Sequence, residues 1–309
     1  MALHTLLGGN GTIATLLIPI LLGEKQTVRL VSRNPVPVAG TEVFKADVVS
    51  HEQVLDAVKG SDFVYLLVGL EYNREVWKKD WPLIMRNTID ACKASKAKLI
   101  FFDNVYMYGR VNGPMTESTP FNPVSEKGRI RAAIDEMLLN EMKGGGLQAI
   151  IAKSADFYGP GATKTSVVGM LVFDKMSKSQ APLYLSKGNK PHSYTYTPDA
   201  ANALYMLAGS ETAYGQTWHL PTAHPALTSR EFNAIAAKYM NAKDKMMVMP
   251  SWLVRTLGLF TRQMKEVGEM LYQNKFLYEF DSSKFEKAFQ FQPTAYEQGI
   301  KETAESFKK

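Results

Sequence analysis

Small residues near the start of the chain have the spacing of a phosphate-binding turn. After a short apolar run, the sequence reads Leu6-Leu7-Gly8-Gly9-Asn10-Gly11-Thr12-Ile13-Ala14 and continues in a helical pattern. The small residues match Gly-x-Gly-x-x-Ala from Gly9, or the variant Gly-x-x-Gly-x-x-Ala from Gly8. Glycines here let backbone N–H groups approach a pyrophosphate at the positive end of the helix dipole. We therefore expect a dinucleotide to be bound by Gly8, Gly9, Asn10, Gly11, Thr12 and Ile13.

The end of the second predicted strand bears on which nicotinamide coenzyme is bound. An acidic residue there binds the ribose hydroxyls of NAD, whereas this chain has Ser32 followed by Arg33. A guanidinium can hold a 2′-phosphate through two hydrogen bonds, so the sequence favours NADP over NAD. The alternative is that Arg33 is a solvated surface residue.

Two further strand ends supply candidate contacts to the dinucleotide. Asp47 and Val48 follow the third predicted strand, where a carboxylate can accept from the adenine amine. Leu67, Val68 and Gly69 end the fourth, where a small residue lets the dinucleotide pass. Ordinary turn chemistry explains either segment equally well.

The elements that must position these residues alternate regularly over the first 155 residues. Short apolar or β-branched runs predict strands near residues 5–7, 27–32, 42–45, 62–68, 98–103 and 147–153. Helical patterns lie between them near residues 12–22, 52–58, 75–94 and 126–142. This order predicts an α/β fold of the Rossmann type, a doubly wound parallel sheet with right-handed crossovers. We assign residues 1–155 to a dinucleotide-binding domain and 156–309 to a smaller substrate lobe, with some segments returning to the main sheet.

Several loose motifs occur in an order typical of one superfamily. Tyr108-Gly109 follows the fifth predicted strand, Tyr158-Gly159-Pro160-Gly161 the sixth, and Tyr196-Thr197-Pro198-Asp199 precedes a late helix. Together with the glycine turn, they make the chain resemble the extended short-chain dehydrogenases/reductases, and most of all the NAD-dependent epimerase/dehydratase group. The resemblance covers nearly the whole chain.

The resemblance implies an active site from which this sequence departs. The family has a Ser or Thr four residues before the tyrosine of the Tyr-Gly pair, and a Tyr-x-x-x-Lys on the next helix. Here Asn104, Lys127 and Arg131 occupy these positions. Asn104 can hold a substrate oxygen and Arg131 the ribose hydroxyls, while like-charge repulsion is expected to lower the pKa of Lys127 and make it a proton carrier. In the alternative interpretation, both cations only bind phosphate or solvent.

The predicted function is an NAD(P)-dependent oxidoreductase or epimerase/dehydratase acting on a hydroxyl or carbonyl compound, with a sugar derivative as one candidate. The loss of Tyr-x-x-x-Lys supports a rival, a non-catalytic NADP-binding sensor. A third interpretation, a scaffold with a vestigial site, predicts no coenzyme affinity.

Composition and charge limit the classes of partner that the protein is expected to bind. The chain has 309 residues, one cysteine (Cys92) and a net charge of +6 with the charges scattered, which excludes a disulfide scaffold and argues against nucleic-acid binding. The five histidines show no i, i+4 ligand pair, so we expect no metal site. We expect a cytoplasmic protein with a small-molecule substrate, no membrane partner, and a homodimer formed, by family analogy, through helices 75–94 and 126–143.

Two features of residues 156–309 are less specific indications of function. His192, in Lys190-Pro191-His192-Ser193-Tyr194, is the histidine most expected near a pocket, although the favoured alternative is a capped loop histidine. Residues 238–275 combine methionines, basic residues and Trp252, Leu257 and Phe260, which suits lobe core, a greasy pocket or a partner surface. Pro250 and Gly258 interrupt this pattern and disfavour a membrane-surface helix.

Overall fold

The computed structural model describes residues 1–163, 165–185 and 188–308. It contains two compact units whose segments alternate along the chain. Unit 1 comprises Met1–Met107, Lys127–Lys153 and Ala201–Trp218. Unit 2 comprises Tyr108–Glu126, Ser154–Ala200 and His219–Lys309. The boundary at residue 155 that the sequence suggests stays a prediction.

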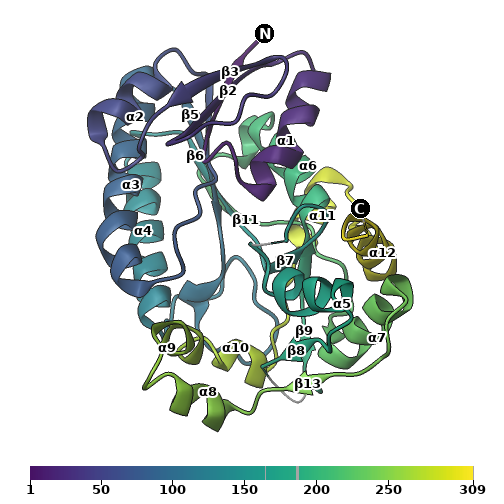
Figure 1. Cartoon of the computed structure of the whole chain (residues 1–309). Helices are drawn as coiled ribbons and strands as arrows, with labels where there is room; N and C mark the ends of the chain where they lie inside the picture. The colour runs from purple at the N-terminus through teal and green to yellow at the C-terminus, as the bar shows by residue number, and fades with distance from the viewer. Residues whose placement is uncertain (164, 186–187, 309) are drawn as a thin grey trace. The chain divides into compact units, whose positions relative to one another are not determined.

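Unit 1 is built on a seven-stranded sheet in the order β11-β6-β5-β4-β1-β2-β3 (Figure 1). In chain order the strands are β1 (Leu3–Leu7), β2 (Thr27–Ser32), β3 (Thr41–Lys45), β4 (Phe63–Leu66), β5 (Lys98–Asp103), β6 (Ala149–Lys153) and β11 (Gln216–His219). The pairings from β3 across to β6 are all parallel. The strand order changes direction at β1, which lies between β2 and β4, so the predicted doubly wound sheet is confirmed.

Helices cover both faces of this sheet (Figure 1). One side carries α2 (His51–Val58), α3 (Arg74–Ser95) and α4 (Glu126–Lys143), and the other carries α1 (Thr12–Gly23) and α6 (Thr197–Ala208), of which residues 201–208 belong to unit 1. A buried core joins α2, α3 and α4 to the sheet; among its members are Val31, Leu66, Trp81, Phe101 and Ile134. Because strands buried on both faces have no solvent side, they show the continuous apolar runs seen in the sequence.

Unit 2 is made of short strand pairs and helices. The pairs are β7 (Asp156–Tyr158) with β10 (Tyr194–Tyr196), β9 (Pro191–His192) with β12 (Leu227–Thr228), and β8 (Leu183–Tyr184) with β13 (Met247–Val248). The helices are α5 (Asp174–Ser177), α7 (Ser229–Met240), α8 (Ser251–Leu257), α9 (Arg262–Gly268), α10 (Tyr272–Lys275), α11 (Ser283–Phe289) and α12 (Tyr296–Ser306). The described residues also form three single turns, η1 (Tyr106–Tyr108), the π-helical η2 (Gly169–Phe173) and η3 (Glu211–Ala213), the last of which lies in unit 1. Aromatic side chains such as Tyr158, Phe173 and Phe232 form the core of this unit.

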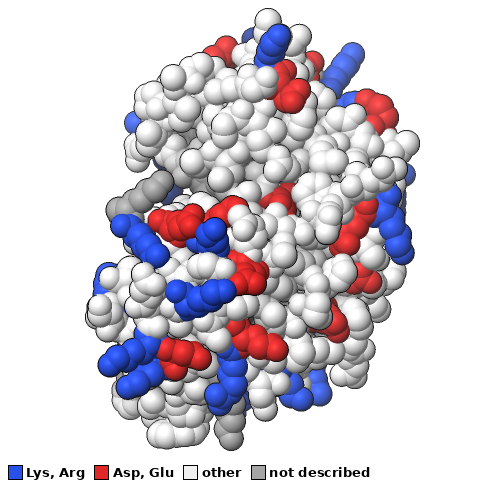
Figure 2. All heavy atoms as spheres, turned by 90° about the vertical axis from the view of Figure 1, so that its right-hand side faces the viewer, with Lys and Arg blue, Asp and Glu red and all other residues white. Residues whose placement is uncertain are grey.

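The surface carries both signs of charge. Figure 2 shows Lys and Arg interspersed with Asp and Glu over the face that it presents. Within the described ranges, no helix is long and apolar enough to cross a bilayer.

Candidate functional site

The glycine turn is packed tightly onto the ends of β2 and β4, the two strands that flank β1. The N–H groups of Gly8 and Gly9 both donate to the Val31 carbonyl, at 2.9 and 3.0 Å, and Gly11 donates to the Gly8 carbonyl at 2.9 Å. Gly8 has a φ of +94°, and a Cβ there would lie 2.9 Å from the carbonyl carbon and oxygen of Leu67. A side chain at this position would therefore be strained and would collide with backbone.

The turn leads directly into the N-terminus of α1. Gly11 is the N-cap, with φ −76° and ψ 161°, and Thr15 closes the first turn by donating to the Gly11 carbonyl at 2.9 Å. The first turn carries no acidic residue that would compete with an anion. The opening amides and the helix dipole therefore favour negative charge at this point, as the sequence predicts.

Asn10 joins the glycine turn to the segment after β2. Its Nδ2 donates to the Asn34 carbonyl at 2.7 Å, and its Oδ1 accepts from the Val36 amide at 3.1 Å. The side chain of Asn10 is thus engaged within the protein. We infer that any contact of Asn10 with a dinucleotide runs through its backbone.

The end of β2 holds an unsatisfied hydroxyl. Ser32 Oγ is buried and has no hydrogen-bond partner among the described residues. Arg33, which follows it, is exposed. A buried hydroxyl without a partner is unfavourable unless a ligand or water satisfies it. Its position suits a ribose hydroxyl of a dinucleotide.

The remaining predicted contacts lie at neighbouring strand ends. Leu7 is in register with both Val31 of β2 and Leu66 of β4, so the segments after these two strands emerge on either side of the end of β1. β4 ends at Leu66, one residue before the segment formed by Leu67, Val68 and Gly69. Gly69 is exposed, and a Cβ there would have no atom within 4 Å, so the chain leaves open space beside it.

Asp47 and Val48 already accept hydrogen bonds from other residues of the protein. Asp47 Oδ1 accepts from the Val49 amide at 3.2 Å, and the Val48 carbonyl accepts from Asn87 Nδ2 at 3.1 Å. Both residues are half-buried. These bonds match the turn chemistry that the sequence left open as an alternative.

The backbone cradle, the helix N-terminus and the orphaned Ser32 hydroxyl meet at one edge of the sheet, and all three fit a dinucleotide. In open α/β sheets, ligands bind where the strand order reverses, outside the carboxyl ends of the strands.

Asn104, and Lys127 and Arg131 on α4, are the residues that the sequence predicts at the family's catalytic positions. Asn104 Oδ1 accepts from the Tyr106 amide at 2.9 Å, which leaves its amide nitrogen as the donor group. Lys127 lies in the first turn of α4 and is fully buried, with its Nζ 4.3 Å from the ring centroid of Tyr72. Burial of an ammonium against an aromatic face is a specific arrangement, unlike a solvated surface lysine.

Arg131 is held by a carboxylate and by aromatic rings. Its Nη1 donates to Asp103 Oδ1 at 2.8 Å, and its guanidinium lies 3.9 Å from the ring centroid of Trp81 and 4.7 Å from that of Trp77. Its Nε is buried and has no hydrogen-bond partner within the described part of the chain. Nη1 is therefore taken by Asp103, and Nε is the donor that stays unsatisfied.

Sequence reasoning missed the buried charge network to which Arg131 belongs. Lys153 Nζ, at the end of β6, contacts Asp103 Oδ2 at 3.3 Å and also donates to the carboxylate of Asp135 on α4. Burial, together with the nearby Asp103 carboxylate, raises the pKa of Asp135 to about 8, and Lys153 opposes this shift. Two signals were present: a lysine that ends the apolar run of residues 149–153, and an Asp one turn after Arg131.

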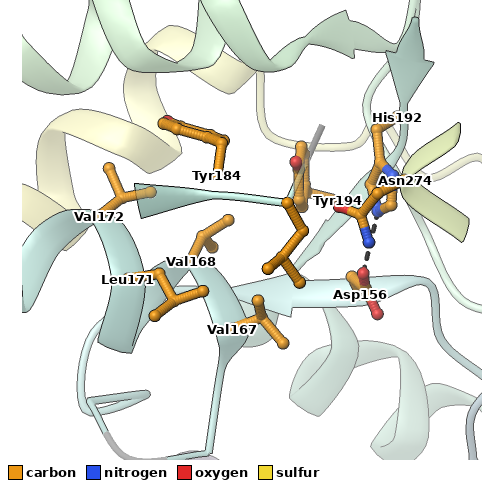
Figure 3. Close-up of a pocket in the computed structure, with 10 residues that line it drawn as sticks. Asp156, Val167, Val168, Leu171, Val172, Tyr184, His192, Tyr194 and Asn274 are labelled. Atoms are coloured by element: carbon orange, nitrogen blue, oxygen red, sulfur yellow. Dashed lines mark hydrogen bonds and ion pairs between the residues drawn. The ribbon is translucent and has the colours of Figure 1, made fainter. Parts of the chain in front are cut away.

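Unit 2 contains a pocket of its own, and His192 lies in its wall (Figure 3). His192 Nε2 is 2.9 Å from Asp156 Oδ2, and the imidazole stacks on Tyr278 with centroids 4.1 Å apart. Apolar side chains form much of the remaining lining: Val167, Val168, Leu171 and Val172. The expectation that His192 lies near a pocket is confirmed. The residues that the structure describes include no cluster of three or more His, Cys, Asp or Glu suited to a metal.

Comparison with known proteins identifies the family. Residues 5–219 match the NAD dependent epimerase/dehydratase family, and the chain belongs to it. A probable dTDP-glucose 4,6-dehydratase of Sinorhizobium fredii is 23% identical over 174 residues, which is 54% of this chain and 48% of that protein. The uncharacterized protein y4nG of the same organism is 24% identical over 253 residues, 79% of this chain and 62% of the relative. The chain thus spans less than two thirds of the length of these curated relatives.

Solved structures share the fold over nearly the whole chain. UDP-glucose 4-epimerase from Thermus thermophilus, in complex with NAD, has a TM-score of 0.79 at 17% identity and covers 99% of this chain and 98% of its own. DesIV, a dTDP-glucose 4,6-dehydratase from Streptomyces venezuelae with NAD and DAU bound, has a TM-score of 0.81 at 16% identity and covers 99% and 97%. The predicted family and fold are therefore both confirmed.

Proposed function

We propose that this protein binds a nicotinamide dinucleotide at the carboxyl edge of the unit 1 sheet and acts on a hydroxyl or carbonyl compound as an oxidoreductase or epimerase/dehydratase. The observation that carries the proposal is the meeting of the Gly8–Gly11 turn, the α1 N-terminus and the unpartnered Ser32 hydroxyl at one edge. Sugar nucleotides are the first substrates to test, because UDP-glucose and dTDP-glucose enzymes share this fold.

The coenzyme assignment is NADP. Ser32 Oγ supplies one hydrogen-bonding group to the adenosine ribose, and the exposed guanidinium of Arg33 supplies charge for a 2′-phosphate. Related structures hold NAD, so NAD is the competitor in every binding measurement.

The nicotinamide supplies hydride transfer when it is bound. A proton must move at the same substrate oxygen, and in this chain Lys127 Nζ takes the place of the family's tyrosine hydroxyl. Asn104 donates a hydrogen bond from its amide nitrogen and orients the substrate oxygen. Arg131, through its bond to Asp103, fixes α4 against β5 rather than reaching the ribose with Nη1.

A non-catalytic sensor is the second candidate. It is favoured by the full burial of Lys127 against Tyr72 and by the engagement of Arg131 with Asp103. Both side chains are held by the protein itself, which a scaffold that only binds a coenzyme would also show. The two candidates share the coenzyme site and differ only in turnover.

The test has two stages. Isothermal titration with NADP and NAD should give saturable binding with NADP preferred, and no binding of either coenzyme would reject the proposal in favour of a vestigial scaffold. Product analysis by mass spectrometry and NMR over a panel of sugar nucleotides and simple alcohols then follows turnover, because an epimerase leaves nicotinamide absorbance unchanged.

A matched pair of variants separates the enzyme from the sensor. Lys127→Met should keep coenzyme affinity and lower turnover about 100-fold or more, as expected for loss of a general acid/base. Lys301→Met, at an exposed position of α12, should change neither. Equal turnover in both variants would remove Lys127 from the mechanism, and coenzyme binding without any product would support the sensor.

We also propose a homodimer built on α3 and α4. Analytical ultracentrifugation should show two chains per particle. A monomer at all concentrations would exclude it.

A further inference from the structure

Strongly exposed apolar side chains lie on α8 and on the turn between α8 and α9. Trp252, Leu259 and Phe260 are 67%, 82% and 81% exposed, and we call these three side chains the α8–α9 tip. The sequence pattern favoured lobe core here, which is correct for Val254 and Met270 but wrong for the tip. Contiguous exposed apolar groups, especially where polar residues border them, mark surfaces that bind a protein, a membrane or a ligand.

The backbone holds the tip in a defined conformation. Gly258 donates to the Val254 carbonyl at 2.9 Å and Phe260 to the Leu257 carbonyl at 3.0 Å, so helical bonding continues to the turn. A Cβ at Gly258 would lie 3.2 Å from the Cα of Lys265, so only a small residue allows α8 and α9 to approach this closely. The exposure of the tip is thus a property of an ordered helical hairpin.

Helix periodicity puts apolar and basic groups on one side of α8. Trp252 and Leu259 are seven residues apart, and Arg255 lies three residues after the first and four before the second. Trp252 and Arg255, three residues apart, therefore share one face of α8, and Leu259 follows two residues after the helix ends. The interruption by Pro250 and Gly258 does not prevent the alignment, because α8 begins after Pro250 and its bonding extends through Gly258.

The charges around the tip have a single sign. Residues 251–265 contain three charged side chains, Arg255, Arg262 and Lys265, and all three are exposed or half-buried. The next residue, Glu266, is buried. The face shown in Figure 2 has mixed charges, whereas this segment combines only cations with large apolar groups.

We propose that the α8–α9 tip docks on an anionic lipid surface. Trp252, Leu259 and Phe260 would enter the boundary between headgroups and acyl chains, and the three cations would lie among lipid phosphates. An exposed tryptophan suits this boundary because its ring is apolar and its N–H is polar. The association is peripheral and goes beyond the proposed function. It runs counter to the expectation that a membrane is not among the partners.

Co-sedimentation of the full chain with vesicles tests the proposal. Binding is expected to phosphatidylcholine vesicles that contain phosphatidylglycerol, to weaken with salt, and to be at least about tenfold weaker without the anionic lipid. The triple variant Trp252→Ser, Leu259→Ser, Phe260→Ser should lose at least about tenfold in vesicle affinity. Val43→Ser, at an exposed apolar position of β3, is the matched control and should bind as the native chain does.

A second measurement reports on the tip itself. Trp77, Trp81 and Trp218 are buried, so a shift of tryptophan emission to shorter wavelength on adding anionic vesicles reports on Trp252 and should vanish in Trp252→Phe. The proposal is overturned by failure to bind anionic vesicles or by unchanged binding of the triple variant. It is equally overturned if the tip instead mediates self-association, seen by ultracentrifugation without lipid and abolished by the triple variant.

Discussion

The glycine turn and the α4 region both contribute to the candidate site, but they are built on different physical principles. The turn is built from backbone amides, a positive φ at Gly8 and the absence of a side chain where Leu67 passes. The α4 region is built from charged side chains, with Lys127 against Tyr72 and Arg131 on Asp103. The sequence predicts that the turn keeps the family pattern, and that Asn104, Lys127 and Arg131 depart from it.

This difference indicates that a site made of backbone groups can be kept while a site made of side chains is altered by substitution. Binding a pyrophosphate needs only small residues and a helix N-terminus, so substitutions elsewhere leave it intact. Moving a proton needs a particular side chain at a particular place. Around Arg131, the interior of unit 1 also holds the buried charged groups Asp103, Lys153 and Asp135. Four experiments test this contrast between the glycine turn and the α4 region.

The largest effect is expected in the buried network. Asp103→Asn leaves Arg131 and Lys153 without their shared carboxylate, and should lower the free energy of unfolding by about 3–5 kcal/mol. Urea denaturation followed by circular dichroism measures it. Glu42→Gln, which removes an exposed partner of Arg29, should cost about 0–1 kcal/mol. Similar losses in both variants would mean that the α4 region does not depend on buried charge.

The next effect concerns the backbone site. Gly8→Ala forces a side chain onto a φ of +94° and against Leu67, so coenzyme binding should be lost together with about 1–3 kcal/mol of stability. Gly60→Ala is the control, because it shares a positive φ of +77° but its Cβ would meet no atom within 4 Å. Calorimetry should show coenzyme binding only in the control. Binding by Gly8→Ala would show that the turn tolerates a side chain.

A smaller effect should appear as a pH dependence. The pKa of Asp135 is raised to about 8 by burial, so the folded chain holds a proton that the unfolded chain releases near pH 4. The free energy of unfolding should therefore fall as pH rises between these values, by at most about 1.4 kcal/mol per pH unit from this group. Asp135→Asn should remove this part of the slope in urea denaturation between pH 5 and pH 8.

Asp174→Asn serves as the control for that slope, because it changes only an exposed pair with Lys178. Its pH dependence should match the native chain. An unchanged slope in Asp135→Asn would show that this carboxyl is ionised throughout the range.

The smallest effect is expected for coenzyme choice. Arg33→Ala removes a charged partner of the 2′-phosphate and should weaken NADP binding about tenfold while leaving NAD unaffected. Titration calorimetry with both coenzymes measures the ratio, with Lys79→Ala as the control. Tighter binding of NAD than NADP by the native chain would reject the NADP assignment.

Sequence reasoning predicted the features that depend on local pattern. The strands of unit 1, its helices and the packing of the glycine turn follow from apolar runs and small residues that lie close together in the chain. The network could not be predicted, because Asp103 and Lys153 are fifty residues apart and either alone looks like the polar end of a strand. The exposure of Phe260 was also missed, since an apolar residue in a helical pattern is ordinarily buried.

The hydrogen bonds of Asn10 bear on the entropy cost of binding a coenzyme at the candidate site. Its side chain bonds both Asn34 and Val36, so the loop that would receive the adenosine end is already fastened to the loop that would receive the diphosphate. Because these two loops are already joined, the protein is expected to lose less conformational entropy when a ligand binds. The Asn10 side chain thereby links two loops of the candidate site before a ligand arrives.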